Sequence, residues 1–234
     1  MSASRALPSV VLITGTGTEV GKTVATAALA SVIRSRGSTV SMVKVAQTGL
    51  APGDPGDADE VSRLAGPLPT HEFIRLPDPL APDAAARRAG VSLPPIAVHA
   101  RRVGELTGET SIVLVEGSGG LLVRLDDRGG TLADLGVALR YKGMSCGVVL
   151  VATAGLGTLN SAALTAEALS HRNLPLLGVI IGDWPAAPGL AEESNVVDLP
   201  RITGAPLWGR IPMGAGRLDA RAFAAAVPNW MEIS

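Results

Sequence analysis

Short runs of consecutive apolar residues recur along the chain, separated by stretches whose apolar residues have helical spacing. Strands that are buried on both faces of a parallel sheet form continuous apolar runs of this kind. The pattern therefore predicts buried strands joined by helical crossovers in one parallel sheet. The predicted strands span residues 10–14, 39–45, 112–115, 147–152, 176–181 and 206–211.

The predicted helices span residues 22–36, 57–64, 97–106, 158–170, 190–202 and 218–226. The first stops before Gly37, a residue type that is common just past a helix end. Segments 49–56 and 184–189 are rich in Pro and Gly and are predicted loops, and segment 67–82 is predicted to be irregular. Because no repeat or linker divides the chain, we expect residues 1–234 to form a single α/β domain, with helices on both faces of the sheet.

Composition narrows the class of protein. Hydrophobic residues make up 47% of the chain and aromatic residues only 3%, so the core must consist mainly of Ala, Val, Leu and Ile. With 20 basic and 21 acidic residues, there is no cationic excess for nucleic acid to bind. Cys146 is the only cysteine, which excludes an internal disulfide and predicts an inert packed thiol. Without a long apolar run or a leader-like start, we expect a soluble cytoplasmic protein that binds no membrane.

The segment GTGTEVGKT at residues 15–23 follows the first predicted strand and opens the first helix. Glycines allow backbone N–H groups to turn toward a phosphate, and the helix N-terminus adds its positive end. Lys22 is suited to the β- and γ-phosphates and the Thr23 hydroxyl to Mg²⁺. The common pattern GxxxxGK[ST] is not matched, because Thr16 stands where it has glycine. The alternative is a glycine-rich turn with no ligand.

This loop resembles the variant phosphate loop of the dethiobiotin synthetase family, GTDTxVGKT, with Gly17 in place of the aspartate. The resemblance implies a P-loop NTPase fold. The loop alone does not separate this family from MinD/ParA-type switch ATPases or cobyrinic-acid-type amidoligases. Thr18 is implied to contact substrate as well as nucleotide. The nucleotide-binding residues implied here are Gly17, Thr18, Glu19, Val20, Gly21, Lys22, Thr23 and Val24.

A second lysine, Lys44, lies at the end of the second predicted strand, at the sheet edge where open α/β sheets bind ligands. The segment KVAQTG from Lys44 resembles the family's KPVxTG, with Val45 in place of proline. The resemblance implies that Lys44, together with Lys22, is catalytic and stabilises the transferred phosphoryl group. It also implies that Thr48 contacts the diamine substrate. The alternative is a solvated lysine at a strand end.

Acidic residues near the start of the second helix offer a metal ligand. Asp57 with the following alanine resembles the family's Asp-Ala pair, whose carboxylate helps hold the metal. The neighbouring Asp54 and Asp59 leave the choice of ligand open. The spacing of Asp57 and Glu60 also fits helix capping, which is the competing interpretation.

The segment EGSGGLLVR from Glu116 ends the strand at 112–115 and resembles the family's EGAGGLLVP. Ser118 and Arg124 are the departures. An acidic group at this edge would meet Mg²⁺ held by Thr23, because Mg²⁺ prefers oxygen ligands. The competing interpretation is a flexible turn with a solvated glutamate. The implied metal ligands are Thr23, Asp57 and Glu116, and the implied nucleotide-binding residues also include Asp57, Glu116, Gly117, Ser118 and Gly119.

The segment GLGTLN at residues 155–160 opens a helix and resembles the family's GLGxINH, with Ser161 in place of histidine. Free N–H groups and the helix dipole can bind an anion. The resemblance implies that this segment receives the substrate carboxylate across a homodimer interface. Ordinary capping by Thr158 is the alternative. The implied substrate-binding residues are Thr18, Thr48, Gly157, Thr158, Leu159 and Asn160.

Two further segments match the family's nucleobase-facing positions. Many relatives have Asn at the position of Asp183, and an ionised Asp cannot donate a hydrogen bond, so adenine preference is not assumed. The segments are Gly182 with Asp183, and Ile211, Pro212 and Met213.

The resemblance implies ATP-dependent closure of the cyclic urea of dethiobiotin from 7,8-diaminononanoate and CO₂. The carbamate of one amine attacks the γ-phosphate of a nucleoside triphosphate, and the second amine then displaces phosphate. The alternatives are a MinD/ParA-like switch ATPase, whose extra loop lysine is lacking here, and another amidoligase.

The histidines have no partners for a triad or a metal set and are predicted at the surface or at helix caps: His71, His99 and His171.

Overall fold

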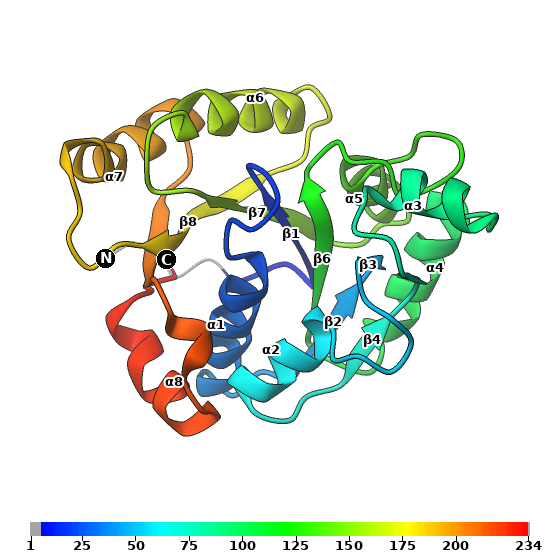
Figure 1. Cartoon of the computed structure of the whole chain (residues 1–234), viewed down its shortest axis with the longest axis horizontal. Helices are drawn as coiled ribbons and strands as arrows, with labels where there is room; N and C mark the ends of the chain where they lie inside the picture. The colour runs from blue at the N-terminus through cyan, green and yellow to red at the C-terminus, as the bar shows by residue number, and fades with distance from the viewer. Residues whose placement is uncertain (1–5, 234) are drawn as a thin grey trace.

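The computed structural model describes residues 6–233, in which seven parallel strands form the central sheet (Figure 1). The spatial order is β4, β2, β6, β1, β7, β8 and β9, so β1 lies at the centre between β6 and β7. The strands are β1 (Val10–Gly15), β2 (Val40–Lys44), β4 (Thr70–Glu72), β6 (Ile112–Gly120), β7 (Cys146–Ala152), β8 (Leu176–Trp184) and β9 (Leu207–Pro212).

Helices cover both faces of the sheet because each strand buries alternate residues on opposite sides. Val11 and Ile13 of β1 pack toward α1 (Lys22–Ser35), α2 (Asp57–Ala65) and α8 (Ala220–Ala226). Val10 and Leu12 pack toward the opposite face. That face is covered by α4 (Ile96–Leu106), α5 (Leu132–Tyr141), α6 (Thr158–Ser170) and α7 (Leu190–Thr203).

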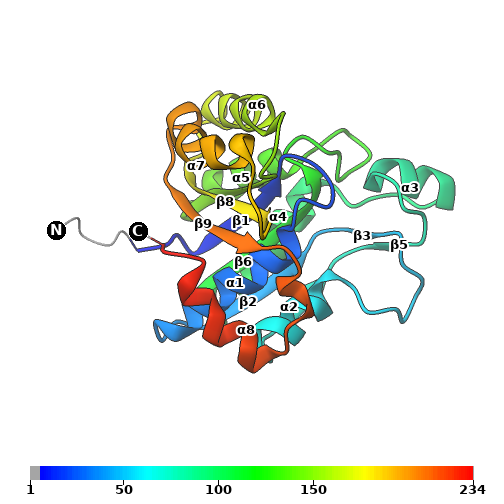
Figure 2. The same cartoon turned by 60° about the vertical axis from the view of Figure 1, so that its left-hand side comes forward.

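A smaller unit projects from one side of the central sheet (Figure 2). Strand β3 (Gln47–Thr48) pairs in parallel with β5 (Arg75–Leu76). Leu76 packs against the buried alanines of α3 (Pro82–Ala89). This unit follows β2 directly, so it stands beside the carboxyl ends of the central strands.

The predicted fold class is confirmed: an α/β parallel sheet with helices on both faces. Each of the six predicted strands is present, and β6 and β8 extend past the predicted ends to Gly120 and Trp184. The strands β3, β4 and β5 and the helices α3 and α5 were not predicted, and β4 and β5 lie in segment 67–82, which was predicted to be irregular. β4 is a polar edge strand without an apolar run. α5 contains Gly136, which lowers helix propensity, but a Cβ there would come within 2.9 Å of Leu12, so close packing requires glycine.

Two local predictions are wrong. The last helix begins at Ala220 rather than 218, because the Asp219 side chain accepts a hydrogen bond from the Ala222 N–H at 2.8 Å and caps it. His99 is fully buried rather than exposed or capping, and its ring stacks on Phe73 with centroids 5.8 Å apart.

Cys146 is buried, and burial raises the pKa of its thiol to about 12, as expected for an inert thiol. No helix within residues 6–233 combines the length and the apolar character needed to cross a membrane.

Candidate active site at the carboxyl ends of β1, β2 and β6

The loop between β1 and α1 packs closely against the end of β8. Gly21 has a φ of +85°, and a Cβ there would come within 2.5 Å of the Gly182 carbonyl oxygen. Glycine is therefore required at position 21 for both conformation and space. At Gly17, by contrast, a Cβ would meet only a Val20 methyl group at 3.9 Å. The aspartate of the family pattern could stand there without a steric clash from the backbone.

Lys22 begins α1 and is buried, with its ammonium group donating to the Gly17 carbonyl at 2.8 Å. Burial is the largest influence on the Lys22 pKa and lowers it, and the positive charge of Lys44 acts in the same direction. Glu116 and Asp57 oppose this shift, but the net direction is downward. A phosphate placed in this loop would favour the charged form of Lys22.

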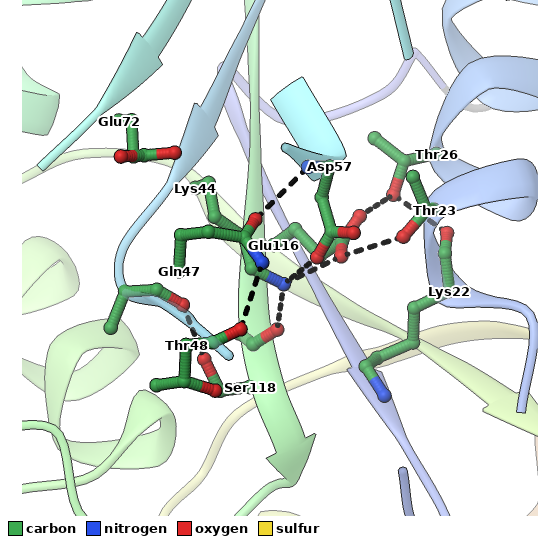
Figure 3. Close-up of polar contacts among 12 residues, drawn as sticks. Lys22, Thr23, Thr26, Lys44, Gln47, Thr48, Asp57, Glu72, Glu116 and Ser118 are labelled. Atoms are coloured by element: carbon green, nitrogen blue, oxygen red, sulfur yellow. Dashed lines mark hydrogen bonds and ion pairs between the residues drawn. The ribbon is translucent and has the colours of Figure 1, made fainter. Parts of the chain in front are cut away.

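Lys44, at the end of β2, is buried between two carboxylates (Figure 3). Its ammonium nitrogen lies 2.5 Å from Asp57 and 2.9 Å from Glu116, and it also donates to the Gly117 carbonyl at 3.2 Å. Burial alone would lower the Lys44 pKa, but Glu116 and Asp57 outweigh it and raise the pKa. The solvated-lysine interpretation is therefore wrong.

Glu116 is completely buried, and the parallel register of β6 with β2 pairs it with Lys44. Its Oε1 accepts hydrogen bonds from Lys44 at 2.9 Å and from the Thr23 hydroxyl at 3.2 Å. The Thr26 hydroxyl lies 2.8 Å from Oε2. The interpretation of Glu116 as a solvated residue in a flexible turn is also wrong.

Three acidic residues near α2 have distinct places in the structure. Asp59 accepts from the Gly56 N–H at 2.8 Å and so caps the helix, while Asp54 accepts from the Ala51 N–H at 3.0 Å in the exposed loop. Asp57 instead turns to Lys44, so the capping interpretation of Asp57 with Glu60 is wrong. Burial raises the Asp57 pKa, but Lys44 more than offsets this and the net pKa is lowered.

Two adjoining cavities open beside these groups. One of about 480 Å³ is lined by the phosphate loop, both lysines, Asp57 and Glu116. The other, of about 600 Å³, reaches toward Leu80 and Val123. The residues that line both are Thr18, Glu19, Thr48, Ser118 and Gly119. Predicted nucleotide and substrate residues therefore meet at one boundary.

The predicted nucleobase residues gather at the neighbouring ends of β8 and β9. Trp184 pairs with Pro212, and the Met213 N–H donates to the Trp184 carbonyl at 2.8 Å. The Arg210 guanidinium lies 4.8 Å from the centroid of the Trp184 ring. Gly182 joins this area to the phosphate loop through its contact with Gly21.

The start of α6 does not join the cluster around Lys44, and its residues 157–160 line neither of the two cavities. Gly157 is the N-cap, with a φ of +88°. Thr158 does not cap the helix, so that interpretation is wrong, and its buried hydroxyl has no hydrogen-bond partner within the described residues. Leu156 beside it is 92% exposed.

Sequence reasoning missed two polar residues at the site. Thr26 lies three residues after Thr23, a spacing that places both on one helix face and could have revealed it. The Gln47 side chain accepts from the Asp57 N–H at 2.9 Å, and no local pattern connects these two distant positions.

Comparison with known proteins gives consistent matches. The family model described as "AAA domain" matches residues 9–216. The chain is 53% identical to the ATP-dependent dethiobiotin synthetase BioD of Streptomyces avermitilis over 95% of this chain and 92% of that protein. It is 56% identical to the protein of the same name from Saccharopolyspora erythraea, over 92% of both chains. The protein of that name from Rhodococcus jostii is 50% identical, over 96% of this chain and 95% of its own.

Solved structures share the fold at low identity. The signal recognition particle receptor FtsY of Elizabethkingia anophelis, in complex with GDP, superposes with a TM-score of 0.57 at 14% identity and covers 97% of this chain and 66% of its own. Signal recognition particle 54 kDa protein from Aeropyrum pernix gives a TM-score of 0.55 at 22% identity and covers 95% of this chain and 46% of its own. At these identities the likeness extends to the fold alone.

Proposed function

The chain belongs to the ATP-dependent dethiobiotin synthetase family, and we propose that its phosphoryl-transfer chemistry takes place beside Lys44. It is an ATP-dependent cyclo-ligase that forms dethiobiotin in biotin biosynthesis; the switch-ATPase and amidoligase alternatives are not favoured. The observation that carries the proposal is the buried Lys44 ammonium, held between Asp57 and Glu116 at the mouth of the phosphate loop.

We infer that residues 17–24 bind the triphosphate, with Lys22 directed to its β- and γ-phosphates. Lys22 now donates to the Gly17 carbonyl, a neutral partner that a phosphate oxygen can replace. Gly117, Ser118 and Gly119 follow Glu116 along the same cavity wall. The proposed base site comprises Gly182, Asp183, Ile211, Pro212 and Met213.

The family's use of ATP implies a metal ion that accompanies the nucleotide, and we propose Mg²⁺. The donor set fits: the Thr23 hydroxyl, Asp57 and Glu116 offer only oxygen atoms, and all three converge on the cavity beside the phosphate loop. The two lysines and two carboxylates have no net charge, so Mg²⁺ would supply the positive charge that the phosphates require.

The adjoining cavity of about 600 Å³ suits the diamine, 7,8-diaminononanoate, with Thr18 and Thr48 at its boundary with the phosphate site. One amine takes up CO₂ as a carbamate, whose oxygen attacks the γ-phosphorus and releases ADP. The second amine then attacks the carbamate carbon of the mixed anhydride, closes the ring and releases phosphate. Lys44 and Lys22 stabilise the negative charge of the transferred group, so no side-chain nucleophile is needed.

The substrate carboxylate has a proposed site at the start of α6, formed by Gly157, Thr158, Leu159 and Asn160 of a second copy. The unpartnered Thr158 hydroxyl and the exposed Leu156 support this homodimer arrangement.

We also propose that residues 1–234 form one domain and that the enzyme is cytoplasmic.

The decisive experiment incubates the protein with 7,8-diaminononanoate, ¹⁴C-bicarbonate, Mg²⁺ and each nucleoside triphosphate in turn. Label should appear in dethiobiotin in amounts equal to the phosphate released, and omission of the diamine should abolish both. Nucleotide hydrolysis that continues without the diamine and fixes no carbon would contradict the proposal.

A further inference from the structure

The first two turns of α1 direct two hydroxyl groups, those of Thr23 and Thr26, toward the Glu116 carboxylate. Thr26 lies four residues after Lys22 and three residues after Thr23, so its side chain neighbours both of theirs on the helix surface. Lys22 and Thr23 belong to the phosphate loop, whereas Thr26 lies one turn deeper and is 0% exposed. Its side chain cannot reach the nucleotide cavity, which it does not line.

The Thr26 hydroxyl has a single proton and two acceptors within reach, the Lys22 carbonyl at 2.9 Å and Glu116 Oε2 at 2.8 Å. A hydrogen bond to a carboxylate is about twice as strong as one to a neutral acceptor. The proton therefore lies toward Glu116. Glu116 is also 0% exposed. Its carboxylate oxygens therefore accept hydrogen bonds from neighbouring side chains rather than from bulk water.

The two oxygens of Glu116 are held from different sides. Oε1 accepts from Lys44 and Thr23, the groups that face the cavity, whereas Thr26 accounts for the hydrogen bond at Oε2 (Figure 3). With the Thr26 bond in place, the plane of the carboxylate is fixed and Oε1 is kept facing Thr23. Without it, Oε2 would be a buried acceptor without a donor, and rotation of the carboxylate toward Lys44 or Thr23 would relieve that cost.

We propose that Thr26 is a positioning residue, which orients the Glu116 carboxylate for the metal ion that accompanies the nucleotide. This inference rests on the proposed role of Glu116 as a metal ligand. Partners that orient metal ligands in this way are worth about 10- to 100-fold in metal affinity in other metalloproteins. The competing explanation is a threonine that merely fills space and hydrogen bonds to its own helix, as helical threonines commonly do.

The test measures Mn²⁺ binding, by electron paramagnetic resonance of the free ion, to the full-length protein saturated with a non-hydrolysable ATP analogue. Thr26→Val replaces the hydroxyl with a methyl group of similar size and should raise the Mn²⁺ dissociation constant about tenfold. Thr26→Ser keeps the hydroxyl and should remain within about twofold of the unmodified protein. Ser31→Ala is the matched control: it removes another hydroxyl bonded within α1, to the Ala27 carbonyl at 3.0 Å, far from Glu116.

A double-mutant cycle with Glu116→Gln separates this inference from the proposal beneath it. If Thr26 acts through Glu116, adding Thr26→Val to the Glu116→Gln variant should change metal affinity by less than about twofold. Unchanged Mn²⁺ binding in Glu116→Gln alone would overturn the metal site itself. Weakened binding in Glu116→Gln with unchanged binding in Thr26→Val would overturn only the role of Thr26.

Comparison of the Thr26→Val and Thr26→Ser variants identifies a purely structural effect. If Thr26→Val and Thr26→Ser weaken Mn²⁺ binding equally, packing rather than the hydroxyl is responsible, and the proposal is wrong. Should valine prevent folding, Thr26→Ala removes the same hydroxyl with a smaller side chain and is compared with Thr26→Ser in the same cycle.

Discussion

The cluster formed by Lys44, Asp57 and Glu116 lies at the carboxyl end of β2, and the start of α6 lies beyond the carboxyl end of β7. The polar groups of the two regions differ in how fully they are hydrogen bonded. In the cluster, the Lys44 ammonium has three oxygen acceptors within 3.2 Å, and Glu116 has hydrogen bonds at both oxygens. At the start of α6, the buried Thr158 hydroxyl has no partner among residues 6–233, and Leu156 is 92% exposed.

The difference indicates what each region requires from outside the chain. The cluster is held in position by its own ion pairs, so a nucleotide would meet groups that are already arranged. A buried hydroxyl without a partner costs about 1–3 kcal/mol, so the start of α6 would gain from an acceptor or donor that the described residues of one chain do not provide. This contrast supports a complete phosphate site in one chain and a carboxylate site that functions between two.

The largest effect is expected from Lys44→Met, which keeps much of the side-chain volume and removes the charge. We expect kcat to fall about 100-fold, about 2.7 kcal/mol, because Lys44 acts mainly on the charge that develops during phosphoryl transfer. ATP affinity should change little. Steady-state kinetics measures kcat, and calorimetric titration measures the affinity for ATP. Lys142→Met, at an exposed lysine after α5, is the control. A kcat within twofold of the unmodified enzyme would remove Lys44 from catalysis.

Asp57→Asn tests the second carboxylate of the cluster. It should raise the Mg²⁺ concentration at half-maximal rate about tenfold, because an amide oxygen carries no charge for the metal. Asp54→Asn serves as the control, since the Asp54 carboxylate accepts its hydrogen bond from the Ala51 N–H of the exposed loop. Equal Mg²⁺ titrations for Asp57→Asn and the unmodified enzyme would exclude Asp57 as a ligand.

At the start of α6, Leu156→Asp should convert a dimer to a monomer, because a charge replaces an apolar side chain where we expect a second copy. Light scattering at the assay concentration measures the mass. We expect the KM for the diamine to rise several-fold while ATP binding is unchanged, since the two regions belong to different subsites. Tyr141→Asp, at a side chain that is 94% exposed on α5, is the comparison. A fully active monomer would contradict the shared site.

The sequence predicts the central strands and the loop glycines well, because buried strands and phosphate loops are encoded by neighbouring residues. It identifies Lys44 and Glu116 as site candidates but not their ion pair, which depends on β6 lying between β1 and β2. The hydrogen bond from the Asp57 N–H to the Gln47 side chain joins residues from different elements. The local spacing of residues therefore does not predict it. α5 was missed because Gly136 indicates a break until its packing against Leu12 is known.

The smallest effects concern stability, and their pH dependence distinguishes the two regions. Because Lys44 lowers the Asp57 pKa on balance, the pair stabilises the fold above the unfolded carboxyl pKa of about 3.9, and this contribution is lost as pH falls through the folded pKa. Urea unfolding should therefore show Asp57→Asn destabilised at pH 6–8, with the difference shrinking below about pH 4.

Thr158→Val removes an unpartnered hydroxyl and no charge, so we expect it to be neutral or stabilising by up to about 1 kcal/mol, equally at every pH. Destabilisation by Thr158→Val would mean that its hydroxyl already has a partner in the free protein, and the contrast between the two regions would fail.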